Sequence, residues 1–282
     1  MIDETAEEIA EMQTHSSSVV ATKAARALAE LTEREYATVE EYEQNLERNS
    51  RALRRASPSH ASLQTTQHDI VAAVMGSADT VEDAKQRTLD AIERVVAAVE
   101  DAKTAAAKNA AAHIEDGMTL LTHDYSTTLI EAIDIAVERG AELEVYVTEA
   151  RPRVLGRKAA RELGAYDEIE VHLTVDGACG YYLPECDAVF LGMACIVDGT
   201  LYNRVGTYPV VATAADVGVP VTVVGSSAKV VTEGFHFEND FRATSEVIRE
   251  PPEGFTVDNP SYDATPTRLL DKLITDEGVT DY

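Results

Sequence analysis

Short β-branched segments alternate with helical segments from Met118 onward, and this alternation constrains the fold more than any other feature of the sequence. The segments expected to be strands are 118–123, 142–150, 168–175, 187–193 and 219–227. Helical patterns lie between them at 127–140, 157–165 and 208–218. Strands that alternate with helices over short connections form a doubly wound parallel sheet with helices on both faces. We therefore predict an α/β fold for this part of the chain.

The residues before Met118 are expected to be helical throughout. Apolar residues recur three and four positions apart at 5–34, 38–56 and 80–117, and the segment 57–77 opens with Ser57-Pro58, a dipeptide typical of helix starts. We predict a helical N-terminal domain over 1–115, ending in one long connecting helix. The α/β domain then occupies 116–282, and its part after Val231 is expected to be irregular, with a short helix at its end.

The composition is strongly acidic, with 50 Asp and Glu residues against 24 Lys and Arg residues and a net charge of −26. Only seven of the basic residues are lysines. In molar salt the Debye length falls to about 3 Å, so such a surface no longer repels itself. We interpret the charge as an adaptation to high salt, the alternative being self-repulsion in an ordinary cytosol. Because basic stripes with interleaved aromatic residues are missing, no direct nucleic-acid partner is expected.

The three cysteines, Cys179, Cys186 and Cys195, lack the CxxC spacing of a zinc site, and we expect reduced thiols in a cytoplasmic protein. The chain opens with an acidic helical segment, which does not resemble a secretory signal. Its apolar runs are too short to span a bilayer, so no membrane partner is expected. The histidines form no metal-binding motif, and neither a metal nor a cofactor is predicted.

Ligands bind at the carboxyl ends of the strands in a doubly wound sheet, so the turns that follow the predicted strands are the informative ones. The turn at 122–128, "THDYSTT", offers hydroxyls and backbone N–H groups before a helix, as an oxyanion requires. Simple N-capping by Ser126 or Thr127 is the alternative. The glycines of a dinucleotide-binding or P-loop motif are absent from this turn.

Two further turns carry side chains suited to phosphate. Arg151, Arg153 and Arg157 follow the second predicted strand, where arginine can bind phosphate with two hydrogen bonds. Their alternative role is a structural cluster paired with Glu149. The segment 203–207, with Asn203, Arg204, Gly206 and Thr207, stands at a helix entrance, where again a capped turn is the alternative. Together the three turns predict one crevice.

These stretches resemble a family that joins two kinds of protein: the alpha, beta and delta regulatory subunits of translation initiation factor 2B, and the aldose–ketose isomerases acting on methylthioribose 1-phosphate or ribose 1,5-bisphosphate. The similar blocks are "LRRASPSHASLQ", "LLTHDYSTTL", "VTEARPRVLGR", "DAVFLGMACIVDGTLYNRVGTYPVVATAA" and "NPSYDATPTRLLDKLITDEGV". The last block is the most specific, because Asn259-Pro260, Asp263, Thr265-Pro266 and Glu277-Gly278 keep the family spacing. The resemblance implies a Rossmann-like second domain and dimerisation through it.

The sequence departs from the isomerase pattern at the positions that carry chemistry. The resemblance places the isomerases' catalytic cysteine at Asp124 and their catalytic aspartate at Ala194. Their phosphate-binding arginine of the helical domain aligns with Ser57. Both groups that would move protons between two sugar carbons are therefore replaced, and alanine can act neither as an acid nor as a base. The charge of Asp124 would also repel a phosphate in the pocket.

We consequently expect a non-catalytic regulatory protein that binds a phosphorylated sugar or nucleotide in a degenerate crevice, as a homodimer or with an initiation-factor-related subunit. One alternative is an isomerase with relocated catalytic groups, for which Cys179, Cys195 and Asp198 are the candidates, together with the carboxylates of Asp124 and Asp176. Another is a structural dimer with no ligand, whose arginines pair with Glu149 and neighbouring acids.

The residues predicted to bind the ligand are His123, Ser126, Thr127, Glu149, Arg151, Arg157, Asn203, Arg204 and Lys229. Among them Arg151 and Arg157 would bind phosphate, with Glu149 orienting both. Asn203 would contact a sugar hydroxyl. Arg204 stands in place of the family's usual lysine. Lys229, after the last predicted strand, would close the pocket.

Overall fold

The computed structural model describes residues 2–11, 16–231, 235, 237–250 and 253–282. Contacts divide the chain into two compact units, Met1–Asp101 and Ala102–Tyr282, so the division falls within the long helix α5 (Val81–Ala111). The C-terminal end of this helix packs into the second unit, where Ala107 and Ala110 are fully buried. The domain division expected at 115/116 stays a prediction.

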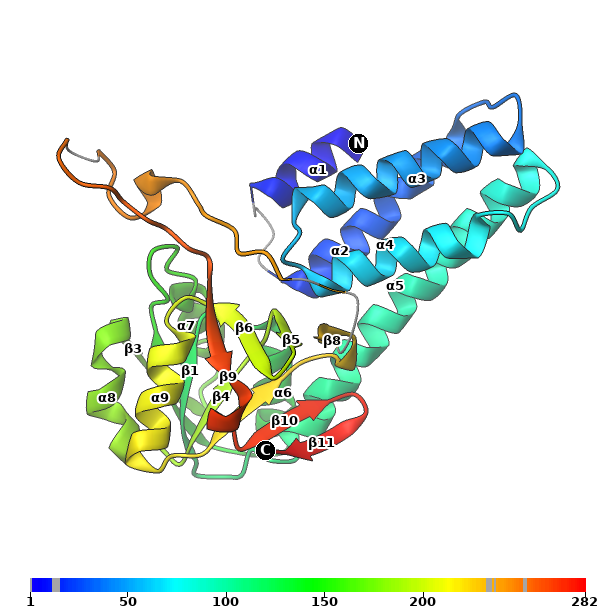
Figure 1. The fold of residues 1–282 in the computed structure, drawn as a ribbon. Coiled ribbons are helices and arrows are strands. Elements are labelled where there is room, and N and C mark those ends of the chain that lie inside the picture. The colour runs from blue at the N-terminus through cyan, green and yellow to red at the C-terminus, as the bar shows by residue number, and fades with distance from the viewer. Residues whose placement is uncertain (1, 12–15, 232–234, 236, 251–252) are drawn as a thin grey trace. The chain divides into compact units, whose positions relative to one another are not determined.

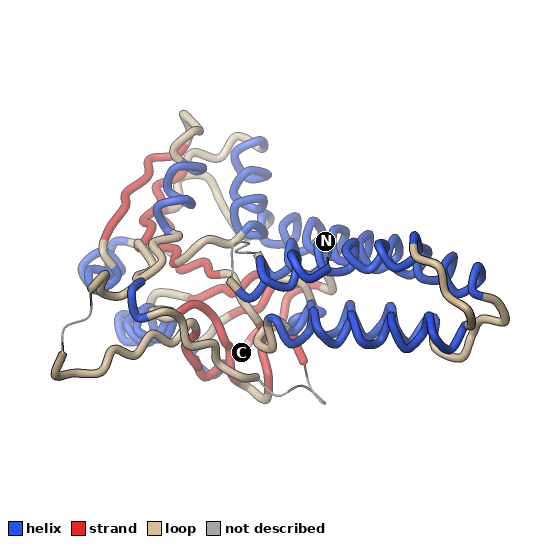
Figure 2. The backbone as a smooth tube through the Cα atoms, turned by 90° about the horizontal axis from the view of Figure 1, so that it is seen from above, coloured by secondary structure: helices blue, strands red, loops and turns tan. Residues whose placement is uncertain are grey.

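The first unit is built from helices, as predicted. They are α1 (Ile2–Ala10), α2 (Ser17–Ala27), the 3₁₀ turn η1 (Leu28–Glu33), α3 (Val39–Ala56), α4 (Ala61–Val74) and the N-terminal part of α5. Figure 2 shows the long helices of this unit running side by side. Helix α3 is capped by Thr38, whose hydroxyl accepts a hydrogen bond from the Glu41 N–H, and it buries Leu46 and Leu53 completely.

One helix start was predicted wrongly. Helix α4 begins at Ala61 and not at Ser57-Pro58, which lies in the turn after α3. The Gln64 side chain donates to the carbonyl oxygens of Arg54 and Ser57, at 2.9 and 3.4 Å. This contact closes the turn between the two helices, because it satisfies carbonyl groups that the end of α3 leaves unpaired.

The second unit contains a seven-stranded sheet in the order β11-β10-β7-β4-β1-β2-β3 (Figure 1). Its central strands are β1 (Thr119–His123), β2 (Leu143–Thr148), β3 (Ile169–Thr174), β4 (Ala188–Leu191) and β7 (Val221–Val224), all parallel and all predicted. The chain winds outward from β1 in both directions, which is the doubly wound arrangement. The predicted Rossmann-like α/β class is therefore confirmed.

Two apolar cores cover the faces of this sheet. The first joins the end of α5 with α6 (Thr127–Glu138) and α7 (Gly156–Leu163), and it includes Leu129 and Leu163. The second joins α8 (Cys179–Tyr182) and the 3₁₀ turn η3 (Leu183–Glu185) with α9 (Thr207–Val217), and it includes Val210 and Val211. The 3₁₀ turn η2 (Asp176–Ala178), which precedes α8, has no buried residue. Because helices cover both faces, the strands β1, β2, β4 and β7 are buried almost without alternation, whereas β3 at the sheet edge is only partly buried.

The C-terminal segment was predicted wrongly. In place of a short helix the chain forms β9 (Tyr262–Pro266), the 3₁₀ turn η6 (Thr267–Leu269), β10 (Lys272–Thr275) and β11 (Gly278–Asp281). Strand β10 pairs in parallel with β7 and buries Leu273 and Ile274, and β11 returns antiparallel to it. The free edge of the sheet decides the conformation here, since adjacent apolar residues fit a helix or a buried strand equally well.

A smaller sheet, absent from the sequence analysis, has the order β8-β5-β6-β9. Strands β5 (Cys195–Val197) and β6 (Thr200–Arg204) form a hairpin, and β8 (Val230–Val231), preceded by the 3₁₀ turn η4 (Ser227–Lys229), lies beside β5. The described residues between β8 and β9, called the excursion below, contain the 3₁₀ turn η5 (Thr244–Glu246), drawn in orange in Figure 1. Within the described residues no helix is long and apolar enough to cross a membrane.

Candidate functional site

The carboxyl ends of β1 and β4 lie side by side where the winding of the large sheet reverses. Asp124 follows β1, and Gly192, Met193 and Ala194 follow β4. The backbone at Gly192 passes so close to Ser126 that only glycine fits, because a Cβ atom at Gly192 would lie 2.6 Å from the Cβ of Ser126. The structure therefore brings the turn after β1 close to the turn after β4.

Asp124 is held in an ion pair with Arg204, at 3.3 Å between Oδ2 and Nε. The side chains are only 12% and 7% exposed. Asp124 has a positive φ of 70°, a conformation that aspartate tolerates better than most residues. Its other carboxylate oxygen, Oδ1, is buried and has no hydrogen-bond partner among the described residues.

Arg204 is anchored from several directions at the end of β6. Burial alone would lower the pKa of its guanidinium, but Asp124, together with Tyr262 and Glu246, outweighs burial, and the pKa is raised above its ordinary value. Nη1 donates to the carbonyl oxygen of Ser261 at 3.4 Å, and the guanidinium lies 5.1 Å from the ring centroid of Tyr262. Such a cation–π contact favours the charged form. Arg204 is thus a cation held in a fixed position beside Asp124.

His123 is a buried supporting residue of the same strand end. Its Nε2 donates to the carbonyl oxygen of Val205 at 2.9 Å, and its Nδ1 lies 2.6 Å from the hydroxyl of Thr148. Both ring nitrogens are thereby occupied within the protein. The ring packs against Gly206, which has a φ of 105° and whose added Cβ would lie 2.5 Å from the imidazole. His123 therefore positions the turn after β6.

Protein groups cap both helix entrances predicted to receive an oxyanion. The Ser126 hydroxyl accepts from the Leu129 N–H at 3.3 Å, as an N-cap of α6. At α9 the Asp263 carboxylate accepts from the N–H groups of Gly206 and Tyr208, at 2.7 and 3.0 Å. A carboxylate at a helix N-terminus occupies the position that a ligand anion would take.

Asn203 and Thr127, two further predicted ligands, lie at these entrances. The Asn203 amide is buried and donates to the Thr207 hydroxyl at 3.1 Å. Thr127 begins helix α6 directly after the Ser126 cap. A contact of either residue with a ligand stays a prediction.

The turn after β2 is held by Asp176, whose two carboxylate oxygens accept from the N–H groups of Ala150 and Arg151 at 2.7 Å each. This explains the positive φ of 58° at Ala150. The side chain of Arg151 is exposed. Arg157 is paired with Glu149, with 2.9 Å between Nε and Oε1. Phosphate binding by these two arginines stays a prediction.

Arg153, the middle arginine of the same turn, belongs to a cluster that the sequence analysis missed. Its Nε lies 4.0 Å from Oε1 of Glu246, and the guanidinium of Arg242 lies 3.3 Å from the same oxygen. Burial lowers the pKa of Arg153, and Arg242 and Arg204 lower it further, while Glu246 and Asp124 act against them. No sequence motif marks Arg242 or Glu246, since the excursion before β9 places them.

Two of the groups proposed for relocated catalysis, Cys179 and Cys195, are buried thiols, and a catalytic role for them stays a prediction. Cys195 is fully buried, and burial raises the pKa of its thiol to about 12. Burial likewise raises the pKa of Cys179. Asp198 lies exposed in the turn of the β5–β6 hairpin. Lys229 is buried and donates to the carbonyl oxygen of Met193 at 3.1 Å, so its charge is directed toward the backbone after β4.

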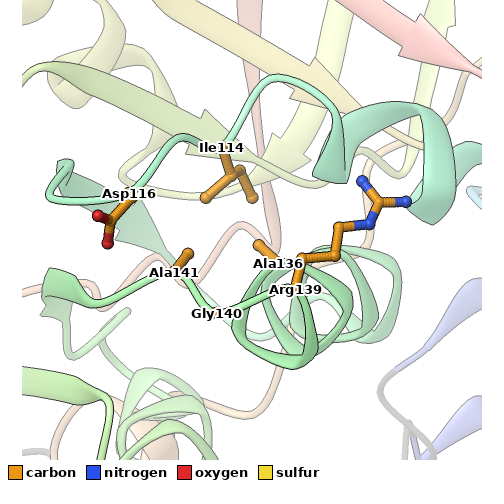
Figure 3. Close-up of a pocket in the computed structure, with 6 residues that line it drawn as sticks. All are labelled: Ile114, Asp116, Ala136, Arg139, Gly140 and Ala141. Atoms are coloured by element: carbon orange, nitrogen blue, oxygen red, sulfur yellow. The ribbon is translucent and has the colours of Figure 1, made fainter.

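A pocket of about 360 Å³ lies elsewhere, at the amino-terminal side of the strands. It is lined by Ile114, Asp116, Ala136, Arg139, Gly140 and Ala141, and Figure 3 shows Asp116 and Arg139 on opposite sides of it. Ligands of doubly wound sheets bind at the other end of the strands. In the described part of the chain, His, Cys, Asp and Glu residues form no group of three or more that could hold a metal ion.

Comparison with known proteins gives consistent matches over nearly the whole chain. The sequence profile described as Initiation factor 2 subunit family matches residues 13–282. The ribose 1,5-bisphosphate isomerase of Haloterrigena turkmenica is 32% identical, and the match covers 97% of this chain and 88% of that protein. The protein of the same name from Haloferax volcanii is 31% identical, over 97% and 87% of the two chains.

The structure is also similar to solved ones. The translation initiation factor eIF-2B subunit delta from A. fulgidus superimposes with a TM-score of 0.79 at 25% identity, covering 99% of this chain and 87% of that chain.

Proposed function

This chain belongs to the initiation factor 2 subunit family, and we propose that it is a non-catalytic regulatory member that binds a phosphorylated sugar or nucleotide. The observation that carries the proposal is the buried ion pair between Asp124 and Arg204. The resemblance places the isomerases' catalytic cysteine at Asp124 and their catalytic aspartate at Ala194. Since alanine has no proton to exchange, the pair of groups needed to move protons between two sugar carbons is incomplete.

The same ion pair makes the site suitable for binding. Arg204 neutralises the carboxylate, which removes most of the repulsion that an isolated Asp124 would exert on a phosphate. The second oxygen, Oδ1, is left to accept a hydrogen bond, and it finds no donor among the described residues. A ligand hydroxyl would supply that donor. Asp124 thus fits a residue that recognises a sugar hydroxyl and does no chemistry.

A second candidate function is aldose–ketose isomerisation. It is favoured by the identity of 32% with a protein named ribose 1,5-bisphosphate isomerase. Catalysis would then need groups other than the family's two. The buried thiol of Cys195 and the exposed carboxylate of Asp198 are poorly placed for such a role, because an acid and a base must each reach the proton that it moves.

A ligand-free structural dimer is the third candidate. Its specific support is that Arg157 pairs with Glu149 and Arg204 with Asp124, as this hypothesis requires.

Homodimerisation, or association with a related subunit, is proposed for each of the three candidate functions. Sedimentation of the purified protein in molar KCl tests it directly, since a monomer at micromolar concentration would contradict it.

The deciding experiment measures turnover of ribose 1,5-bisphosphate and methylthioribose 1-phosphate in molar KCl, together with thermal shifts with the same compounds and AMP. The H. turkmenica relative serves as the positive control in the same buffer. The proposed function is supported if no substrate is turned over and one of the compounds raises the melting temperature. Turnover would overturn it, and no response in either assay would favour the ligand-free dimer.

A matched variant tests the crevice itself. The double substitution Asp124→Cys with Ala194→Asp restores both catalytic residue types, and the new thiolate would lie beside Arg204, a neighbour that lowers a thiol pKa. Turnover by this variant and not by the wild-type protein would show that the crevice still accepts the sugar phosphate and lacks only the catalytic groups.

A further inference from the structure

The pocket at the amino ends of β1 and β2 is separate from the crevice. Of its lining residues, Ile114 and Asp116 precede β1, whereas Arg139, Gly140 and Ala141 precede β2, all within the second unit. The crevice lies at the opposite, carboxyl ends of the strands. The volume of about 360 Å³ is at the lower end of the range of about 300–1,000 Å³ for small-molecule sites. The pocket therefore has room for a small ligand.

The pocket forms where α6 ends in a Schellman motif. The Gly140 N–H donates to the carbonyl oxygen of Val137 at 2.8 Å, and the Ala141 N–H donates to that of Ala136 at 3.1 Å. Gly140 has the left-handed conformation that this motif requires, with a φ of 95°. The motif brings together positions 136 and 141, where apolar side chains frequently make contact. Because both residues are alanines, a hollow is left beside them.

Apolar side chains form the floor of this hollow. Ile114, Ala136 and Ala141 are only 6%, 2% and 6% exposed. Figure 3 shows them between Asp116 on one side and Arg139 on the other. The order of groups across the pocket is therefore an anion, an apolar surface and a cation. A ligand whose two opposite charges are joined by an apolar chain has the complementary order.

Both charged side chains can accept such a ligand. The Arg139 side chain is exposed, and within the described part of the chain its guanidinium has no ion pair or hydrogen bond. Its N–H donors match a carboxylate with two parallel hydrogen bonds. Asp116 accepts from the Glu142 N–H at 2.9 Å through Oδ1, which fixes the carboxylate and leaves Oδ2 for an ammonium group.

A simpler role for Arg139 is interaction with the C-terminal end of α6. A cation at that position is favourable because the last carbonyl groups of a helix carry partial negative charge. This role accounts for an arginine at the end of the helix. It does not account for an apolar hollow beside the arginine with a fixed carboxylate on its far side, and a ligand accounts for all three features.

We propose that this pocket binds a small ω-amino carboxylate, a linear molecule with an ammonium group at one end and a carboxylate at the other. Arg139 binds the carboxylate, Asp116 binds the ammonium group, and the methylene chain lies on Ile114 and the two alanines. This inference goes beyond the proposed function, because it assigns a second ligand site that shares no residue with the crevice.

Calorimetry with the full chain in molar KCl tests the proposal, with 6-aminohexanoate as the probe. Hexanoate and hexylammonium have nearly the same chain but only one charge each. Both should bind about tenfold more weakly than 6-aminohexanoate, since each leaves one charged side chain without a partner. Equal binding of the three compounds would overturn the proposal, because it would show apolar contact alone. So would a wild-type protein that does not bind 6-aminohexanoate.

Two variants remove one charge each from the pocket. Arg139→Gln and Asp116→Asn should each weaken binding of 6-aminohexanoate by about tenfold. Asparagine keeps an oxygen for the Glu142 N–H, so the turn is preserved. In Arg139→Gln the advantage of 6-aminohexanoate over hexylammonium should also disappear, because the carboxylate has lost its partner. A purely structural role for Arg139 predicts that this advantage persists, which would overturn the proposal.

Two control variants remove exposed charges of the same signs elsewhere in the second unit. They are Arg161→Gln on α7 and Asp167→Asn just before β3. Both should bind 6-aminohexanoate as the wild-type protein does, and equal losses in the controls and the pocket variants would contradict a specific site. Ala141→Leu fills the hollow and should abolish binding, while its melting temperature shows that the variant is folded. Undiminished binding by folded Ala141→Leu would place the ligand elsewhere and overturn the proposal.

Discussion

The Asp124 carboxylate lies 3.3 Å from Nε of Arg204, in an ion pair whose two side chains are almost completely buried. One residue follows the first strand of the large sheet, and the other ends a strand of the small sheet. The pair therefore links the two sheets at the site. Removing one partner of a buried ion pair leaves the other charge uncompensated, which costs far more than the net contribution of the intact pair.

The first prediction concerns this pair. Asp124→Asn keeps the size of the side chain but leaves the Arg204 charge buried, so we expect the free energy of unfolding to fall by about 3 kcal/mol. Urea unfolding in molar KCl measures the change. The control is Glu149→Gln, whose partner Arg157 is 48% exposed, and for which a change below about 1 kcal/mol is expected. Equal losses in both variants would contradict a special role for the buried pair.

The second prediction concerns the close approach of Gly206 to His123. A Cβ at Gly206 would meet the imidazole at 2.5 Å, and the φ of 105° is itself unfavourable for alanine. Gly206→Ala should therefore lower the free energy of unfolding by about 2–4 kcal/mol. At Gly177 an added Cβ meets open space, so Gly177→Ala should change the free energy of unfolding little. Similar stability of the two variants would refute the predicted clash.

The third prediction concerns pH. Burial lowers the pKa of Lys229 from its ordinary value of 10.5 to about 8. Between these values the unfolded chain binds more protons than the folded one, so this residue makes the free energy of unfolding rise as the pH increases from 8 to 10.5. Below this window both states are protonated, and above it both are neutral. In the Lys229→Met variant, this contribution to the rise in the free energy of unfolding should be absent.

The measurement is urea unfolding of the wild-type protein and of Lys229→Met at several pH values across that window. Other tyrosines and lysines titrate in both proteins, so only the difference between the two curves reports on Lys229. Parallel curves would show that the buried ammonium group has an ordinary pKa.

The fourth prediction concerns salt. The net charge of −26 repels itself most strongly when screening is weak. The Debye length falls from about 10 Å at 0.1 M salt to about 3 Å at 1 M. We therefore expect the melting temperature to rise steeply with KCl over this range, as measured by calorimetry. A neutral osmolyte, which does not screen charge, serves as the control. A melting temperature that is indifferent to KCl would contradict adaptation to salt.

Much of the fold could be predicted from local pattern. The strands β1, β2, β3, β4 and β7 of the large sheet and the helices between them follow from β-branched runs and 3.6-residue periodicity. The apolar signal is most continuous in β1, β2, β4 and β7, because these strands are buried on both faces. Strands β10 and β11 were missed for the opposite reason. The segment that forms them has no strong periodicity of its own, and the exposed edge of β7 determines its conformation.

The sequence by itself determined which residue types stand at the carboxyl ends of the strands, including Asp124 and Ala194 at the two positions that the resemblance marks. Only the tertiary structure decided which charges meet. Arg153 lies beside Arg242 and Glu246, which are distant in the chain, whereas Arg157 pairs locally with Glu149 and Arg151 points to solvent. The physical reason is that secondary structure depends on near neighbours, whereas the partner of a charge depends on the packing of segments that no local pattern encodes.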